Sequence, residues 1–117
     1  KPDISGKSEN IKVRSFLGRY LEHSRIFNFF NGGEEEFWIG SADLMDRNLN
    51  RRIEALVRIE SSDHKSRLDS LLNLYADPRV KRWEMNSSGE WNRIVQDKDG
   101  EFFDLHSKLL AGGAYGR

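Results

Sequence analysis

A histidine and an arginine lie two residues apart where a β-strand is expected to begin, and they are the residues best suited to chemistry. His23 and Arg25 precede the apolar pair Ile26-Phe27, and the chain later returns through a Gly-Ser-Ala-Asp corner at residues 40–43. Histidine exchanges protons near neutral pH, and arginine can bind two phosphate oxygens at once. Together these residues indicate chemistry on a phosphate.

The sequence Asn31-Gly32-Gly33 between the two segments predicts a tight hairpin turn. If the turn is centred on its first glycine, residues whose numbers sum to roughly 64–66 face each other. His23 then lies opposite residues 41–43, and Arg25 lies opposite residues 39–41. The hairpin would therefore bring a histidine, an arginine, Ser41 and Asp43 to one end of a sheet, where α/β proteins often carry their chemistry.

Hydrophobic periodicity predicts strands and helices along the rest of the chain. Strands are expected over residues 11–15, 24–30, 35–41, 53–59, 80–85 and 90–95. Helical segments are expected over residues 16–22, as one turn within 43–50, from the cap at 61–63 to Asp77-Pro78, and over 102–110. The consecutive apolar residues 55–57 predict a strand that is covered on both faces.

Composition excludes several classes of protein. The chain has 117 residues, 19 basic and 19 acidic side chains, and no cysteine. Zero net charge gives no overall field toward nucleic acid or membranes, and the absence of cysteine excludes disulfides, thiolate chemistry and cysteine metal sites. No apolar run is long enough for a membrane span, and no signal peptide is recognisable. The abrupt start at Lys1 indicates a soluble fragment of a longer protein.

Two blocks of sequence resemble the last domain of the type 1 polyphosphate kinases. The first is Ser-Glu-Asn-Ile-Lys-Val-Arg-Ser at residues 8–15 with Gly-Arg-Tyr-Leu-Glu-His-Ser-Arg-Ile at residues 18–26. The second is Ile-Gly-Ser-Ala-Asp-Leu-Met-Asp-Arg-Asn-Leu-Asn-Arg-Arg-Ile-Glu at residues 39–54. The C-terminal domains of that family resemble phospholipase D halves, each built around a His-x-Lys hairpin. Arg25 replaces that lysine, and Asp43 replaces the asparagine of the usual Gly-Ser-x-Asn. Both departures fit a kinase half better than a phosphodiesterase half.

The resemblance implies an α/β fold: a phospholipase D-like mixed β-sheet with flanking helices, forming a single domain over residues 1–110 with a flexible tail over 111–117. It implies a parent enzyme that reversibly transfers the terminal phosphate of ATP to polyphosphate with Mg²⁺. The phosphohistidine of that reaction belongs to a preceding domain outside this chain, so the fragment alone is expected to be inactive. The implied parent is a cytoplasmic homo-oligomer, at most peripheral to a membrane, which binds polyphosphate and no nucleic acid.

The resemblance also places the family's ATP-binding, transfer-supporting histidine on His23. The expected ATP- and phosphate-binding residues are His23, Arg25, Arg47, Arg51 and Arg52. Glu22 and Asp43 are candidates to orient the imidazole, and no metal ligand is expected in this chain.

Structural roles remain open for each of these residues. His23 can be merely solvated, Arg25 can pair with Glu22 or Glu36, and the other three arginines can pair with Asp46 and Glu54 on a solvated face. Asn48 can cap the local helical turn. The aromatic residues Phe27, Phe29, Phe37 and Trp38 are expected in the sheet core.

Two other functions stay open beside the kinase. One is a non-catalytic polyanion-binding or assembly module, and the other is a phospholipase D-like phosphodiesterase half. His106-Ser107-Lys108 spells the His-x-Lys pattern, but it lies outside the resembling blocks in a segment expected to be helical. It is therefore interpreted as structural.

Overall fold

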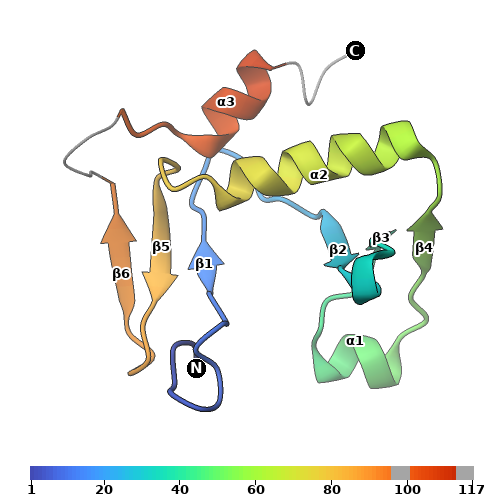
Figure 1. Cartoon of the computed structure of the whole chain (residues 1–117), viewed down its shortest axis with the longest axis horizontal. Coiled ribbons are helices and arrows are strands. Elements are labelled where there is room, and N and C mark those ends of the chain that lie inside the picture. Colours follow the sequence, from blue (N-terminus) through green and yellow to red (C-terminus); the bar gives the residue numbers. More distant parts are fainter. Residues whose placement is uncertain (96–100, 113–117) are drawn as a thin grey trace. The chain divides into compact units, whose positions relative to one another are not determined.

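The computed structural model describes residues 1–95 and 101–112, except for the side chain of Leu49, and it combines helices with antiparallel strands (Figure 1). The contacts divide the chain into two compact units. Unit 1 comprises Lys1–Tyr20 and Leu74–Arg117, and unit 2 comprises Leu21–Asn73. Each unit contains one three-stranded sheet.

The prediction of one mixed sheet is wrong for the described residues, which form two sheets with antiparallel neighbours throughout. An isolated bridge between Val80 and Phe103 is parallel. For two of the four pairings the reason lies in the short turns at residues 30–35 and 86–90, because strands joined by a few residues pair antiparallel and parallel neighbours need a long crossover. The predicted combination of helices and strands is confirmed.

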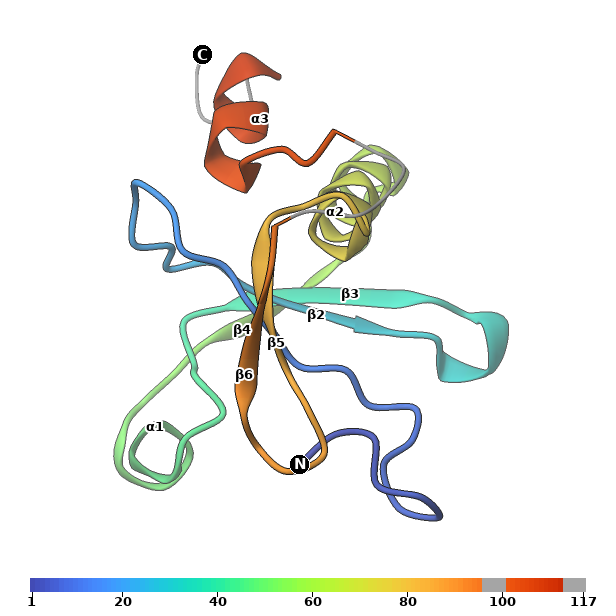
Figure 2. The same cartoon turned by 90° about the vertical axis from the view of Figure 1, so that its left-hand side faces the viewer.

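Unit 2 is built on the predicted hairpin. Strand β2 (Arg25–Phe29) pairs with β3 (Glu36–Gly40), with Arg25 opposite Gly40 and Phe29 opposite Glu36 (Figure 2). Paired residue numbers therefore sum to 65, as the turn chemistry predicted. The turn is a short 3-10 helix, η1 (Asn31–Gly33), in which all three residues have positive φ. Glycine adopts these angles without a steric penalty, so Asn-Gly-Gly fixes the register.

The other elements of unit 2 follow the hairpin. Helix α1 (Asp46–Arg51) is the predicted helical turn, and β4 (Leu56–Ile59) pairs antiparallel with β3. Helix α2 (Ser62–Ala76) ends just before Asp77-Pro78, as predicted. Proline has no N–H to donate and its ring restricts the preceding residue, which explains the end of the helix.

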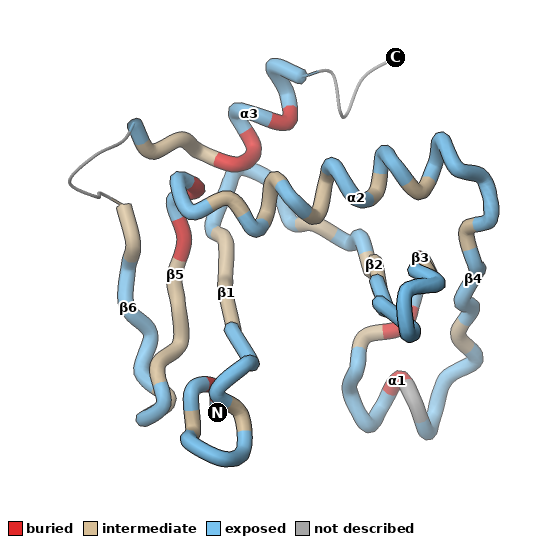
Figure 3. Tube along the Cα trace, viewed as in Figure 1, coloured by how far each residue is buried: buried red, intermediate tan, exposed pale blue. Residues whose placement is uncertain are grey.

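The two faces of this sheet are covered unequally. Phe37 is only 1% exposed and belongs to the core, whereas Phe29 on the opposite face is 54% exposed. The prediction that these aromatic residues all lie in the sheet core is therefore wrong for Phe29. The expectation of a fourth strand covered on both faces is also wrong: Leu56 and Val57 are exposed, and β4 is pale over most of its length in Figure 3. Successive residues of this edge strand point to opposite faces, and the described chain covers neither face fully.

Unit 1 contains the second predicted hairpin. Strand β5 (Arg82–Met85) lies between β1 (Arg14–Ser15) and β6 (Trp91–Ile94), and α3 (Leu105–Ala111) is the predicted terminal helix. The helix extends one residue into the expected tail, of which residues 113–117 lie outside the described part. The predicted strand over residues 11–15 is shortened to its last two residues.

A partly buried ion network links residues of the sheet of unit 1. Arg82 donates from Nε to Glu84 Oε1 at 2.7 Å, and Arg14 donates from Nε to the same oxygen at 3.1 Å. Arg82 also donates to the backbone carbonyls of Pro78 and Val80, so its buried guanidinium is well satisfied. Burial alone raises the pKa of Glu84, but the hydrogen bonds and charges of the two arginines hold it below the usual value.

The helical turn predicted over residues 16–22 is wrong. The segment is irregular because it packs against α3, where His106 is 3% exposed. The backbone N–H of Tyr20 donates to His106 Nδ1 at 3.3 Å, and a Cβ on Gly18 would lie 2.1 Å from the same nitrogen. The structural interpretation of His106 is therefore supported, since its ring is used in packing the N-terminal segment.

We expect Gly18→Ala to lower the free energy of unfolding by about 1–3 kcal/mol, because the added methyl group overlaps a buried ring. Urea unfolding followed by circular dichroism measures the change. The double variant Gly18→Ala/His106→Ala removes the overlapping ring and should recover part of the loss. Strictly additive losses would show that the two residues do not touch.

Candidate functional site

The predicted residues gather at one end of the hairpin of unit 2. Arg25 begins β2 directly opposite Gly40, the last residue of β3. His23 lies just before this pair in the sequence, and residues 41–43 lie just after it. The antiparallel register therefore brings the two sequence segments together, as the sequence predicted.

Arg25 is held by Asp43. Its Nε donates to Asp43 Oδ1 at 2.7 Å, its Nη2 forms an ion pair with the same oxygen at 2.7 Å, and its Nη1 donates to the backbone carbonyl of His23. The hydrogen bond from Arg25 is the main reason why the pKa of Asp43 lies below its ordinary value, and partial burial opposes it. The alternative pairing with Glu36 is not formed, because Glu36 pairs with Arg58 at 3.1 Å.

His23 presents its side chain to solvent. The residue is exposed, and its imidazole has no hydrogen-bond partner among the described residues. Its carbonyl is held by Arg25, so the backbone is fixed while the ring stays accessible to a ligand. Asp43 binds Arg25, and Glu22 is half-buried next to His23; direct orientation of the imidazole by either carboxylate stays a prediction.

The Gly-Ser part of the corner has a structural role. A Cβ on Gly40 would lie 2.5 Å from the backbone oxygen of Ala55 and 2.4 Å from Leu56 Cδ2, so only glycine fits there. The Ser41 N–H donates to the Ala55 carbonyl at 3.1 Å, and its hydroxyl donates to Glu54. These contacts tie the end of β3 to the residues that lead into β4.

The arginines of α1 and of its C-cap do not form the predicted ion pairs with Asp46 and Glu54. Arg47, Arg51 and Arg52 are exposed, and none forms an ion pair within the described part of the chain. Asp46 instead accepts a hydrogen bond from Asn50 at 2.6 Å, and Glu54 accepts one from Ser41. The charge of Arg47 also contributes to the lowered pKa of Asp43. No described contact joins Arg51 or Arg52 to it.

Asn48 was predicted only as a possible cap of the helical turn, and the structure places it beside the site residues. It is 3% exposed, it contributes to the lowered pKa of Asp43, and its Oδ1 has no partner among the described residues. The predicted capping role is not what is observed: Met45 occupies the N-cap of α1, and no side chain caps it. No sequence pattern separates Asn48 from its exposed neighbour Asn50.

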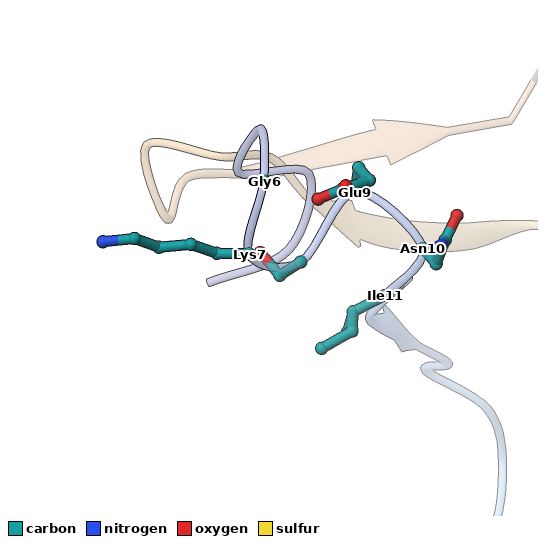
Figure 4. A pocket seen from close by; sticks show the side chains of 6 residues that line it. Gly6, Lys7, Glu9, Asn10 and Ile11 are labelled. Carbon is teal, nitrogen blue, oxygen red and sulfur yellow. The ribbon is translucent and has the colours of Figure 1, made fainter.

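Cavities of different size lie within the described residues of each unit. In unit 2, a cavity of about 530 Å³ lies between the sheet and α2. Its lining is mostly apolar and includes Ile26, Ile39 and Leu71, with Arg25 and Ser41 among its polar residues. In unit 1, the N-terminal loop lines a cavity of about 150 Å³ with residues 6–11, and Lys7 extends away from the loop (Figure 4). Neither cavity gathers several cationic groups.

The described residues contain neither a cluster of metal-binding side chains nor a helix able to span a membrane. They contain no group of three or more histidine, aspartate or glutamate side chains placed to hold a metal ion. No helix among them combines the length and apolar character needed to cross a bilayer.

We expect Asp43→Asn to destabilise the chain near neutral pH and not at low pH. The folded-state pKa of Asp43 is lowered, so its stabilising contribution is complete above the unfolded value of about 4 and disappears as the pH falls through the folded value. Urea unfolding of both proteins at about pH 6 and about pH 2.5 tests this. Asp69→Asn, on the exposed face of α2, is the control. A difference that stays constant over this range would contradict the bond to Arg25.

Comparison with known proteins shows a consistent set of relatives. The family model for polyphosphate kinase C-terminal domain 2 matches residues 1–103. The chain is 52% identical over 101 residues to a polyphosphate kinase of Streptomyces coelicolor, covering 86% of the chain and 14% of that protein. It is 52% identical over 109 residues to one of Prochlorococcus marinus, covering 93% of the chain and 15% of that protein.

A solved structure has the same fold. The crystal structure of polyphosphate kinase from Porphyromonas gingivalis matches with a TM-score of 0.81 and 32% sequence identity, covering 95% of this chain and 17% of the other. The chain therefore spans only about one seventh of the length of the relatives that it matches.

Proposed function

The chain belongs to the polyphosphate kinase family, where it matches the second C-terminal domain, and from this premise we propose that it supplies His23 to the phosphate path of such a kinase. In the proposed reaction the whole enzyme moves the terminal phosphate of ATP reversibly onto polyphosphate. The histidine that carries the phosphate lies outside this chain. The chain alone is then inactive, and its fold is half of a phospholipase D-like pair, with residues 1–110 as the domain.

The observation that carries this proposal is that the His23 ring is exposed while its backbone is held in place. Its ring is exposed and unbonded among the described residues, whereas its carbonyl is held by an arginine that a carboxylate fixes in turn. A group held by its backbone, with its reactive atoms free, is preorganised for a ligand. The imidazole can donate an N–H to a phosphate oxygen of ATP, and in its protonated form it adds positive charge where negative charge develops during transfer.

Arg25 receives a different role from the one first expected. Its guanidinium is engaged by Asp43 and by the His23 carbonyl, so its first function is to position His23. The exposed arginines Arg47, Arg51 and Arg52 are better candidates to bind polyphosphate, because no carboxylate among the described residues forms an ion pair with them. Phosphoryl transfer depends largely on such positive charge around the moving oxygens.

In the proposed reaction, magnesium and the remaining partners are bound by the whole enzyme. We assign Mg²⁺ to the ATP complex that acts as substrate. The preceding domains supply the phosphorylated histidine. A homo-oligomeric parent in the cytoplasm fits the proposed reaction.

A non-catalytic polyanion-binding module is the second candidate, and the arginines without ion pairs favour it. It differs from the first candidate in one respect: His23 then has no effect on turnover. A phospholipase D-like phosphodiesterase half is less favoured, because Arg25 stands in place of the lysine and is bound to Asp43.

We expect His23→Ala in the full-length kinase to reduce turnover by roughly 10²–10⁴-fold, the usual scale for an acid–base group. Stability should be unchanged, because the ring is exposed and buries little surface. Transfer of labelled phosphate from ATP is the measurement, with His64→Ala on α2 as a control that removes another exposed histidine. Nearly normal turnover of the His23 variant would exclude the catalytic role and leave the non-catalytic polyanion-binding module as the remaining candidate function.

We also expect the chain to bind polyphosphate weakly and less strongly at high salt, since exposed charges are screened over about 8–10 Å at physiological ionic strength. Arg51→Ala/Arg52→Ala should weaken binding by roughly 3–10-fold, because exposed ion pairs contribute a few tenths to about 1 kcal/mol each. Calorimetric titration at two salt concentrations measures this. Arg67→Ala is the control on α2. An affinity for polyphosphate that changes neither with salt nor with the double substitution would exclude these arginines from the phosphate path.

A further inference from the structure

We propose that Asn31 is a site of spontaneous deamidation and that this modification weakens the hairpin of unit 2. The reactants are the side-chain amide of Asn31, the backbone nitrogen of Gly32 and water. The products are ammonia and either aspartate or isoaspartate at position 31. The reaction does not depend on the function proposed above, because it takes place in the turn between β2 and β3, at the end of the hairpin away from His23 (Figure 2).

The sequence gives Asn31 the least hindered neighbour of any asparagine in the chain. Deamidation begins when the backbone nitrogen of the following residue attacks the carbonyl carbon of the asparagine side chain. A side chain on the following residue hinders this approach, and glycine has none. Among the asparagines of the chain, only Asn31 is followed by glycine. The same two residues that make the tight turn therefore also make a reactive pair.

The structure leaves the reacting groups of this pair open. Asn31 and Gly32 are exposed, and a Cβ placed on Gly32 would have no atom within 4 Å. The Gly32 N–H donates no hydrogen bond within the described part of the chain, whereas the next N–H, that of Gly33, donates to the Phe30 carbonyl at 2.9 Å. The attacking nitrogen is therefore accessible to solvent and is not engaged by another group.

The turn of unit 1 shows the contrast of a well-anchored asparagine. Asn86 Oδ1 accepts hydrogen bonds from the N–H groups of Ser88 and Glu90 at 3.1 and 2.9 Å, and Asn86 Nδ2 donates to Glu90 Oε2 at 3.1 Å. In the described part of unit 2, the Asn31 side chain makes one hydrogen bond, from Nδ2 to Glu36 Oε1 at 3.2 Å. A single exposed hydrogen bond is readily exchanged for one to water, so the Asn31 amide can rotate toward Gly32.

The reaction balances with water as the only added reactant. The Gly32 N–H gives its proton to solvent, its nitrogen bonds to Asn31 Cγ, and the Cγ–Nδ2 bond breaks as ammonia leaves with a proton from solvent. The cyclic imide then takes up one water molecule. Cleavage of its bond between nitrogen and Cγ gives aspartate. Cleavage between nitrogen and the backbone carbonyl carbon gives isoaspartate, in which Cβ has become part of the main chain.

Both products disturb contacts of the hairpin. Aspartate removes the Nδ2 donor and places a second carboxylate beside Glu36, which also accepts from Trp38 Nε1 at 3.0 Å and pairs with Arg58 Nη2 at 3.1 Å. Neighbouring like charges are destabilising. Isoaspartate lengthens the backbone of the turn, and the length of that turn sets the pairing of Arg25 with Gly40 at the other end of the strands. We therefore expect isoaspartate to disturb the hairpin more than aspartate.

The first measurement tests the site itself. The 117-residue chain is stored in mildly alkaline buffer at physiological temperature, and lost amides are mapped by mass spectrometry of its peptides. We expect Asn31 to lose its amide first, and we expect the same peptide to accept a labelled methyl group from an isoaspartate methyltransferase. Asn31→Gly is the matched control, because glycine tolerates the positive φ at this position and carries no amide. This variant should lack both signals.

Two results of this measurement would overturn the proposal. One is faster loss of the amide at Asn86 than at Asn31. The other is an Asn31 amide that persists in the folded chain and is lost only in urea, because the folded turn would then protect the residue.

The second measurement tests the consequence for the hairpin. Asn31→Asp, which reproduces one product, should unfold at a lower urea concentration than the unmodified chain, and the purified isoaspartyl form should unfold at a still lower one. Amide hydrogen exchange in β2 and β3 of the isoaspartyl form should become faster as far as Arg25 and Gly40, with β5 and β6 of unit 1 changing least. Unchanged urea midpoints and unchanged exchange in β2 and β3 would show that the modification does not weaken the hairpin and would overturn this part of the proposal.

Discussion

The ion pair between Arg25 and Asp43 is the interaction on which the arrangement of the site depends. It joins the first residue of β2 to the segment that follows β3, and it closes the open end of the hairpin. Both side chains are partly exposed, at 23% and 33%, so the pair adds little to stability as a simple ion pair. Its main consequence is geometric, because the same guanidinium also holds the carbonyl of His23.

This arrangement divides the polar residues of unit 2 into two groups. Arg25, Ser41, Asp43 and Glu54 bond to one another or to the backbone, and they build the end of the hairpin. The His23 imidazole and the arginines of α1 have no ion-pair partner among the described residues. A phosphate chain needs positive groups that no internal carboxylate neutralises, and the second group has this property. These side chains are therefore suited to bind phosphate oxygens.

The sheet of unit 2 is less covered than its sequence suggests. Leu56 and Val57 belong to an apolar run typical of a strand buried on both faces, yet both are more than half exposed. The chain spans about one seventh of the relatives that it matches. A hydrophobic run in the sequence indicates that a strand can be buried. Whether it is buried depends on the elements that pack against it. The same distinction applies to Phe29 on the neighbouring hairpin strand.

The sequence by itself determined the features that depend on neighbouring residues. The Asn31-Gly32-Gly33 turn fixed the register of β2 and β3, and Asp77-Pro78 explained the end of α2. Turn geometry and helix periodicity act over a few residues, so one sequence is enough to predict them. The tertiary structure decided what depends on distant partners: Gly18 lies against His106, which keeps residues 16–22 out of a helix. The sequence placed Arg25 and Asp43 at the same end of the sheet, but only the tertiary structure showed that they bind each other and that Asn48 is buried while Asn50 is exposed, because side-chain partners and burial depend on how the whole unit packs.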